Sequence, residues 1–122
     1  GLIQQFRDLQ LNGICVVLQN SVFINLSDLC QCKTILLKHE NSDVMRAGEL
    51  IRHLKNARTS HARSIWHEPH AHDAAVKLFA QESRLPGVEL DLLMRGPEDP
   101  PLDYYITVMQ RNIDQLKRSA QQ

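Results

Sequence analysis

Three features are scarce in the sequence: paired cysteines, long apolar runs and an excess of charge of one sign. The cysteines number three, and the apolar runs are far shorter than the roughly 20 residues that a membrane-spanning helix needs. Lysine plus arginine and aspartate plus glutamate both number 14, so the formal net charge is zero. These absences argue against a disulfide scaffold and a membrane-spanning chain, and they give no global argument for a nucleic-acid partner.

Aromatic residues are also scarce, at 5% of the 122 residues, whereas hydrophobic residues of all kinds make up 43%. This apolar content is typical of a globular chain, so we expect one compact domain with a core mainly of leucine, isoleucine, valine and methionine. Cys15, Cys30 and Cys32 are odd in number and lie in apolar surroundings. Free thiols of this kind are typical of reducing compartments, which predicts an intracellular protein, nuclear or cytoplasmic.

Catalytic signatures are missing as well. The sequence has no glycine-flanked serine elbow, no phosphate-cradling glycine loop and no dinucleotide-binding fingerprint. Reactive cysteines need an electropositive, partly exposed setting, which Cys15 beside Val16 and Val17 does not have. We therefore expect a protein that is not an enzyme and that uses no cofactor, no small-molecule substrate and no membrane.

Histidine is what the chain does concentrate: the stretch HARSIWHEPHAHD, residues 61–73, contains four of the six. A helical zinc-protease site requires His-Glu-x-x-His, because residues four apart share one helix face and can reach one ion. Here the histidine that follows Glu68 comes one position early, at His70, and Pro69 would break the required helix. The spacing predicts no metal site, and we interpret the stretch as a polar connection between helices.

Hydrophobic periodicity places helices along most of the chain. Two β-rich runs predict a β-hairpin over residues 13–26, with one buried helix through the same stretch as the alternative. Apolar residues at helical spacing predict helices over about residues 28–39, 43–58 and 71–82, the first of them capped by Ser27. The predicted fold class is mainly α, a small helical domain with an N-terminal hairpin, and an α+β arrangement is the alternative.

The most regular pattern lies at the C-terminal end. The run GPEDPP at residues 96–101 cannot continue a helix and predicts an acidic linker between a domain of residues 1–95 and a heptad-like helix over 102–122. Apolar residues in this helix recur at alternating spacings of four and three, the period of a coiled-coil seam. This stripe packs within the chain's own bundle or binds a protein partner or second copy. Its contact residues would be Leu102, Tyr105, Ile106, Met109, Ile113 and Leu116.

Although the total charge is zero, residues 46–63 carry five cationic side chains against one acid, Glu49. These five are Arg46, Arg52, Lys55, Arg58 and Arg63. Such a helix face is usually just solvated, but it can also meet an acidic protein or a nucleic-acid backbone. The segment VFINLSDLC resembles, at Asn25, Ser27 and Leu29, the strand-to-helix stretch of KilA-N and related fungal DNA-binding domains. That resemblance implies a DNA-binding hairpin and helix as the alternative function.

The function that these patterns predict is interaction rather than catalysis. A regular apolar stripe that follows a linker must be buried somewhere, and a second copy or another protein can offer the matching surface. We therefore expect a non-enzymatic interaction or oligomerisation module, an adaptor subunit of a larger intracellular complex, that acts through its C-terminal helix.

Overall fold

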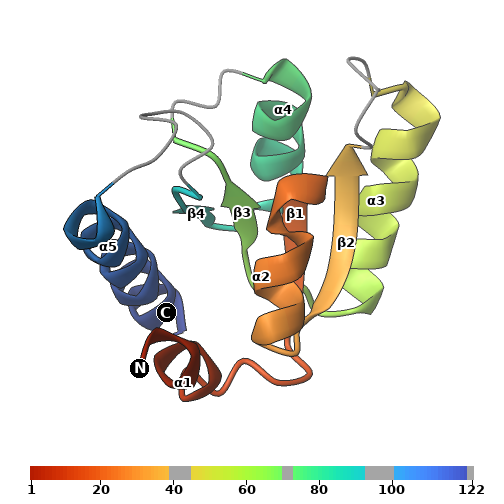
Figure 1. Ribbon diagram of the computed structural model, residues 1–122. Coiled ribbons are helices and arrows are strands. Elements are labelled where there is room, and N and C mark those ends of the chain that lie inside the picture. The colour runs from red at the N-terminus through yellow and green to blue at the C-terminus, as the bar shows by residue number, and fades with distance from the viewer. Residues whose placement is uncertain (39–44, 70–72, 93–100, 121–122) are drawn as a thin grey trace.

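The computed structural model describes residues 1–38, 45–69, 73–92 and 101–120, and in these ranges four strands alternate with helices (Figure 1). The strands are β1 (Cys15–Asn20), β2 (Lys33–Lys38), β3 (Ile65–His67) and β4 (Gly87–Glu89). The helices are α1 (Leu2–Arg7), α2 (Ile24–Leu29), α3 (Ala47–Thr59), α4 (Ala74–Ser83) and α5 (Leu102–Ala120), and a 3-10 turn, η1 (Ser21–Phe23), precedes α2.

The four strands run parallel, in the order β2-β1-β3-β4. β1 lies inside the sheet, where Val17 is level with Ile35 of β2 on one side and with Ile65 of β3 on the other. Parallel neighbours cannot be joined by a tight turn, so a helix lies in each connection. Parallel sheets are covered on both faces, which explains why β1 reads as a continuous apolar run rather than an alternating one.

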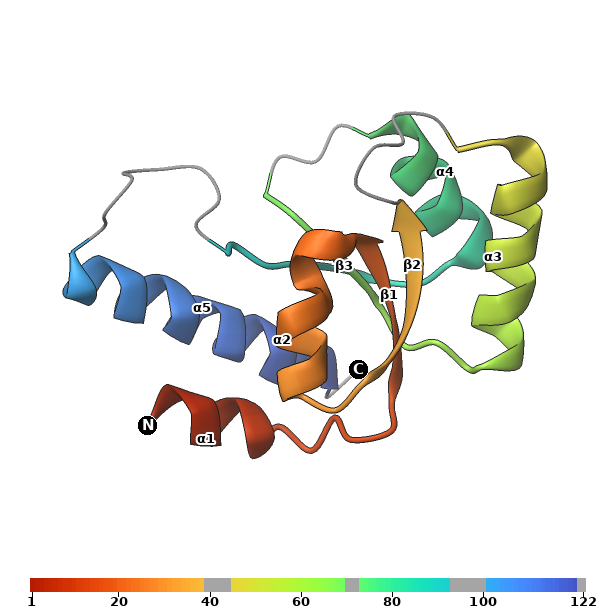
Figure 2. The same cartoon turned by 45° about the vertical axis from the view of Figure 1, so that its right-hand side comes forward.

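Helices cover both faces of the sheet and produce three layers (Figure 2). α1, α2 and α5 pack on one face and share a core with Val16 and Leu18 of β1. α3 and α4 pack on the other face, around Val17 and Ile65. Successive side chains of a strand point to opposite faces, which is why neighbouring valines of β1 belong to different cores.

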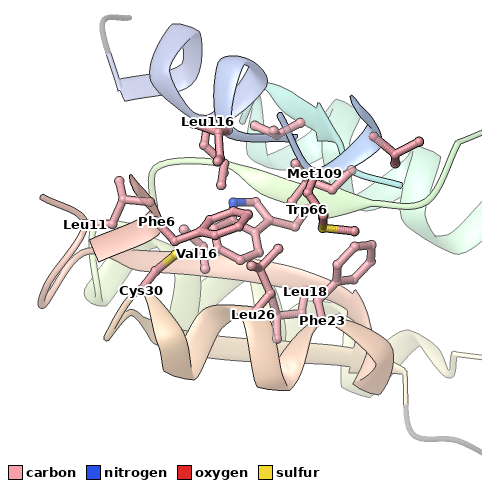
Figure 3. Close-up of a cluster of buried hydrophobic side chains, with 14 residues drawn as sticks. Phe6, Leu11, Val16, Leu18, Phe23, Leu26, Cys30, Trp66, Met109 and Leu116 are labelled. Carbon is pink, nitrogen blue, oxygen red and sulfur yellow. The ribbon is translucent and has the colours of Figure 1, made fainter. Parts of the chain in front are cut away.

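Trp66 of β3 lies at the centre of the first core, with Met109 and Leu116 of α5 to one side and Phe6 and Leu26 to the other (Figure 3). Its side chain is 1% exposed. A buried tryptophan removes roughly 150–250 Å² from water, so this ring is a major contact between the sheet and the helices on this face. α5 is therefore packed against the sheet through its second half, and it also contacts α1 and β4.

The predicted hairpin over residues 13–26 is wrong, and the physical reason lies at Asn20. The side-chain oxygen of Asn20 accepts a hydrogen bond from the backbone N–H of Val22 at 3.0 Å, which caps η1 and turns the chain out of β1. The second β-rich run therefore forms η1 and the start of α2 instead of an antiparallel strand. Phe23 and Leu26 of this run are buried in the first core.

The helix predicted over residues 28–39 is also wrong, because α2 ends at Leu29 and the chain continues as β2. Gln31 has a φ of 60°, which no α-helix accommodates. Ser27, the expected cap, lies inside α2, where its Oγ donates to the carbonyl of Ile24 at 2.8 Å. The mainly α fold class and its α+β alternative are thus both replaced by an α/β fold with a parallel sheet.

The helices predicted over 43–58 and 71–82 correspond to α3 and α4 with shifted ends. Asp73 caps α4, because its carboxylate accepts hydrogen bonds from the N–H groups of Ala75 at 2.9 Å and Val76 at 3.4 Å. The same carboxylate forms an ion pair with Lys38 of β2. Burial alone would raise the pKa of Asp73, but the Lys38 ammonium and the two amides lower it below its usual value.

α5 occupies most of the predicted C-terminal helix, whereas the predicted linker at 96–101, except for its last residue, lies outside the described residues. Among the described residues, no helix is both long enough and apolar enough to cross a membrane.

Candidate functional site

The edge of the sheet at which the four strands end, here called the carboxyl edge, contains a topological switch point. β2 lies on one side of β1, and the next strand along the chain, β3, lies on the other. The connections that leave β1 and β3 therefore diverge, and in open parallel sheets ligands bind in the crevice that this divergence leaves. The residues that follow β1, β3 and β4 at this edge are the natural candidates for a binding site.

Glu68 follows β3 directly, and two residues of β1 hold it in place. The backbone N–H of Glu68 donates to Oε1 of Gln19 at 2.8 Å, and Nδ2 of Asn20 donates to Oε2 of Glu68 at 3.1 Å. Gln19 is one of the few buried polar side chains of the chain. Both the main chain and the carboxylate of Glu68 are thereby oriented across the β1–β3 switch point, while the residue keeps partial access to solvent.

Asp91 follows β4, next to Glu68 along the carboxyl edge. His67 is level with Glu89 in the β3–β4 pair, and the N–H of Leu90 donates to the carbonyl of His67 at 2.9 Å. Glu68 and Asp91 therefore follow the same register pair by one and by two residues, on adjacent strands whose axes are roughly 4.8 Å apart. The main chains of these two acidic residues are thus close to one another at the ends of the strands.

His67 supports the same edge from the second face of the sheet. Its Nδ1 donates to the carbonyl of Glu68 at 3.0 Å. Its Nε2 lies 2.9 Å from the point where a Cβ of residue 87 would stand, so Gly87 is required for the close approach of the ring to β4. The imidazole is therefore a packing and positioning group between β3 and β4.

Two carboxylates at one edge can supply oxygen ligands to a divalent cation. The donor chemistry of Glu68 and Asp91 fits such an ion, and Asn20 already orients one carboxylate. Among the described residues, however, no group of three or more His, Cys, Asp or Glu side chains could hold a metal ion. A cation at this edge would therefore need further ligands besides these two carboxylates.

A cavity of about 660 Å³ lies at the same edge of the sheet, beside the N-terminal ends of α3 and α4. Its walls are largely apolar, with Met45, Leu50 and Leu78 among them. The carboxylate in its lining, Asp73, is already used by Lys38 and by the α4 amides. This cavity is therefore a poorer place for a cation than the Glu68–Asp91 edge.

The residues predicted to bind a partner through α5 fall into two groups. Met109, Ile113 and Leu116 are buried in the first core of the chain itself. Leu102, Tyr105 and Ile106, in the first two turns, are exposed, with Leu102 70% exposed. The apolar stripe is thus covered by its own chain over the second half of the helix, so it is not a continuous free surface.

The five cationic residues predicted to contact nucleic acid or an acidic partner are all exposed. α3 contains Arg52, Lys55 and Arg58. Arg46 directly precedes α3, and Arg63 lies two residues before β3. The hairpin that should accompany them in a DNA-binding domain does not exist.

Of the histidine stretch, His70 and His72 lie outside the described residues, and His61 lies two residues beyond the end of α3 with a φ of 53°. The cysteines are free thiols. Burial raises the pKa of Cys30 to about 11, and burial together with the two neighbouring thiols raises the pKa of Cys32 to about 12. Both thiols are therefore protonated and unreactive near neutral pH.

Glu68 and Asp91 were missed as site residues, since Glu68 was considered only within a helical zinc motif and Asp91 belongs to no motif. The signal was present: SIWHE and VELD both end a short apolar run with an acid. Recognising it requires knowing that these runs are parallel strands, because only then do their ends meet at one edge.

No family model matches the sequence, and no curated protein matches it. Solved structures do share the fold. The SBP FpvC from Pseudomonas aeruginosa, in complex with Mn²⁺, superposes with a TM-score of 0.73 at 16% identity. A Mn-bound mutant of a periplasmic metal binding protein from Candidatus Liberibacter asiaticus gives 0.70 at 16%, and a Zn(II)-bound mutant variant of AdcAII from Streptococcus pneumoniae gives 0.74 at 13%.

Each of these alignments covers 98% of this chain but only 46%, 45% and 43% of the three neighbours. The chain therefore spans less than half the length of the proteins it is similar to. At such low identities the likeness shows the fold alone.

The predicted function is corrected by these neighbours. An adaptor or oligomerisation module was expected from the apolar stripe of the C-terminal helix, and a DNA-binding domain was expected as the alternative from the basic stretch and the hairpin. The chain instead has the fold of metal-binding proteins. The predicted intracellular location is contradicted by a neighbour described as periplasmic, and the predicted absence of a small ligand is contradicted by neighbours that hold Mn²⁺ or Zn²⁺.

Proposed function

We propose that this chain is one lobe of a two-lobed solute-binding protein for a divalent metal ion, Mn²⁺ or Zn²⁺. Glu68 and Asp91 supply carboxylate ligands from the carboxyl edge, and the remaining ligands come from a second lobe. The metal is cargo, so the protein binds and releases it without a catalytic step. Its place of action is outside the cytoplasm, as in the periplasmic neighbour.

One observation carries this proposal: two acidic residues end neighbouring strands beside the switch point of a fold shared with Mn²⁺-bound and Zn²⁺-bound proteins. The shorter length of the chain supports the idea of a half site. A two-lobed protein closes on its ligand, and each lobe contributes only a part of the coordination shell. This explains why the described residues offer two acids here rather than a complete set of ligands.

Oxygen ligands suit Mn²⁺ somewhat better than Zn²⁺, which prefers histidine and cysteine. The Asn20 amide orients the carboxylate of Glu68, because its Nδ2 donates a hydrogen bond to Oε2. The residues of the chain thus bind the ion and orient its ligands.

Isothermal titration calorimetry with MnCl₂ and with ZnCl₂ tests the proposal. Glu68→Gln and Asp91→Asn should each weaken binding by roughly tenfold or more, because each removes an anionic ligand without changing its size. Glu82→Gln on α4 and Asp114→Asn on α5 are matched controls, since both side chains are exposed and lie in helices. No binding of either ion up to millimolar concentration, or equal losses in the controls, would refute the proposal.

A further inference from the structure

Asn112 is a buried polar residue on the apolar face of α5. Its side chain is 2% exposed and lies beside Met109 and Ile113, which belong to the first core. An amide in such a place costs free energy unless its hydrogen bonds are made. The hydrogen bonds of this amide are made mainly with the main chain.

Both ends of the Asn112 amide bond the main chain of Asp91. The backbone N–H of Asp91 donates to Oδ1 of Asn112 at 2.9 Å, and Nδ2 of Asn112 donates to the carbonyl of Asp91 at 2.6 Å. Nδ2 also lies 3.7 Å from the sulfur of Met109. The two bonds to Asp91 form a clamp that fixes one peptide segment relative to a helix.

The position of the clamp matters, because β4 lies at the edge of the described sheet, where it pairs with β3. Just beyond β4, none of the described strands lies on the outer side of the main chain. The amide of Asn112 offers the donor and acceptor that a neighbouring strand would offer. α5 itself is anchored by Ile113 and Leu116, which are 0% and 1% exposed, so the clamp is attached to a rigid element.

We infer that Asn112 is a positioning residue for the metal site, which sets the Asp91 main chain so that the carboxylate meets the ion in one orientation. This inference rests on the proposed function, since it needs Asp91 to be a ligand. Groups that orient a ligand without touching the ion commonly change metal affinity by about 10–100-fold. Here the orienting group acts on the main chain of the ligand rather than on its carboxylate.

Leucine has nearly the same shape as asparagine but cannot make the two bonds to Asp91. In Asn112→Leu the N–H and the carbonyl of Asp91 lose the partner that they have on α5, so the variant should be less stable than wild type. Loss of stability and loss of the clamp are therefore separated by a variant that weakens the same helix and keeps the clamp.

The experiment compares Asn112→Leu and Asn112→Ala with Ile113→Val as the matched control. Ile113→Val loosens the same helix at the next position and leaves the clamp intact. Three quantities are measured: the melting temperature, the hydrogen-exchange rate of the Asp91 amide, and the dissociation constant for Mn²⁺ by calorimetry with MnCl₂. Asn112→Leu should lower the melting temperature, speed exchange at Asp91 and raise the dissociation constant by roughly tenfold or more.

Ile113→Val should lower the melting temperature and leave the dissociation constant within twofold of wild type. If wild type binds Mn²⁺ and both Asn112 variants bind it within twofold, or if neither variant folds, Asn112 serves only the fold and the inference is wrong. If wild type itself does not bind, the proposed function fails first and the inference falls with it.

Discussion

Replacing Ile113 with alanine should destabilise the chain far more than the same replacement at Ile106, two helical turns earlier on the same stripe. Ile113 is 0% exposed, so its truncation loses the transfer free energy of the removed methyl groups and leaves a cavity. Together these effects cost about 2–5 kcal/mol in buried sites. Since Ile113 is fully buried, we expect a loss of about 3 kcal/mol.

Ile106 is 42% exposed, and its truncation therefore removes only a part of the roughly 1.5–3 kcal/mol that full burial is worth. Water fills the space, so no cavity is left. Alanine also has a helix propensity higher than isoleucine by a few tenths of a kcal/mol, which offsets some of the loss. The expected change in the free energy of unfolding is about 1 kcal/mol or less.

Chemical denaturation followed by circular dichroism measures the free energy of unfolding of both variants and wild type, and thermal unfolding measures their melting temperatures. For a chain of this size each kcal/mol lowers the melting temperature by roughly 3–6 °C, so Ile113→Ala should melt about 10–15 °C below wild type and Ile106→Ala within a few degrees of it. Equal losses at the two positions would mean that the first turns of α5 are covered as well as the last ones. The placement of this helix would then be wrong.

Three further predictions follow from single contacts. Asp73→Asn should keep the α4 cap but lose the ion pair with Lys38. Because the pKa of Asp73 is lowered in the folded state, wild type should lose stability as pH falls below the usual aspartate pKa and through the lowered one, and the variant should lose less, as acid denaturation will measure. Gly87→Ala should cost about 1–2 kcal/mol, since the new Cβ meets the His67 ring, and His67→Ala in the same chain should relieve most of that cost in urea titrations; an unrelieved cost would contradict the clash. Cys30, which is buried and whose pKa is raised to about 11, should react with a disulfide reagent far more slowly at pH 8 in the folded chain than in urea, and equal rates would contradict its burial.

Helix periodicity identified α3, α4 and α5, but it could not identify the sheet. Strands buried on both faces lack the alternation of polar and apolar residues that marks a strand, and β3 and β4 are only three residues long. β2 was misread because Leu29, Cys32 and Leu36 happen to fall at helical spacing. The turn at Asn20 was interpreted as a hairpin because polar residues separate two apolar runs there. The sequence does not show in which direction the chain continues after such a turn.

The candidate site depends on the sheet, so it could not be predicted once the sheet was missed. Glu68 and Asp91 are 23 positions apart in the sequence and become neighbours only when β3 and β4 pair in parallel. The role of Asn112 is even less visible, because an asparagine within an apolar stripe predicts nothing until its bonds to Asp91 are known. The α5 pattern itself was read correctly as an apolar seam, but its cover, a sheet of the same chain, could not be inferred from spacing.

Paramagnetic broadening by Mn²⁺ tests the central claim most directly, because the unpaired electrons of the ion broaden nearby amide signals even when binding is weak. In a ¹⁵N-labelled chain titrated with MnCl₂, the signals of Glu68 and Asp91 should fade first, followed by those of Gln19 and Asn20, and Asp91→Asn should abolish the effect. Broadening centred on any other part of the chain, or none at these residues, would contradict a metal site at the carboxyl edge.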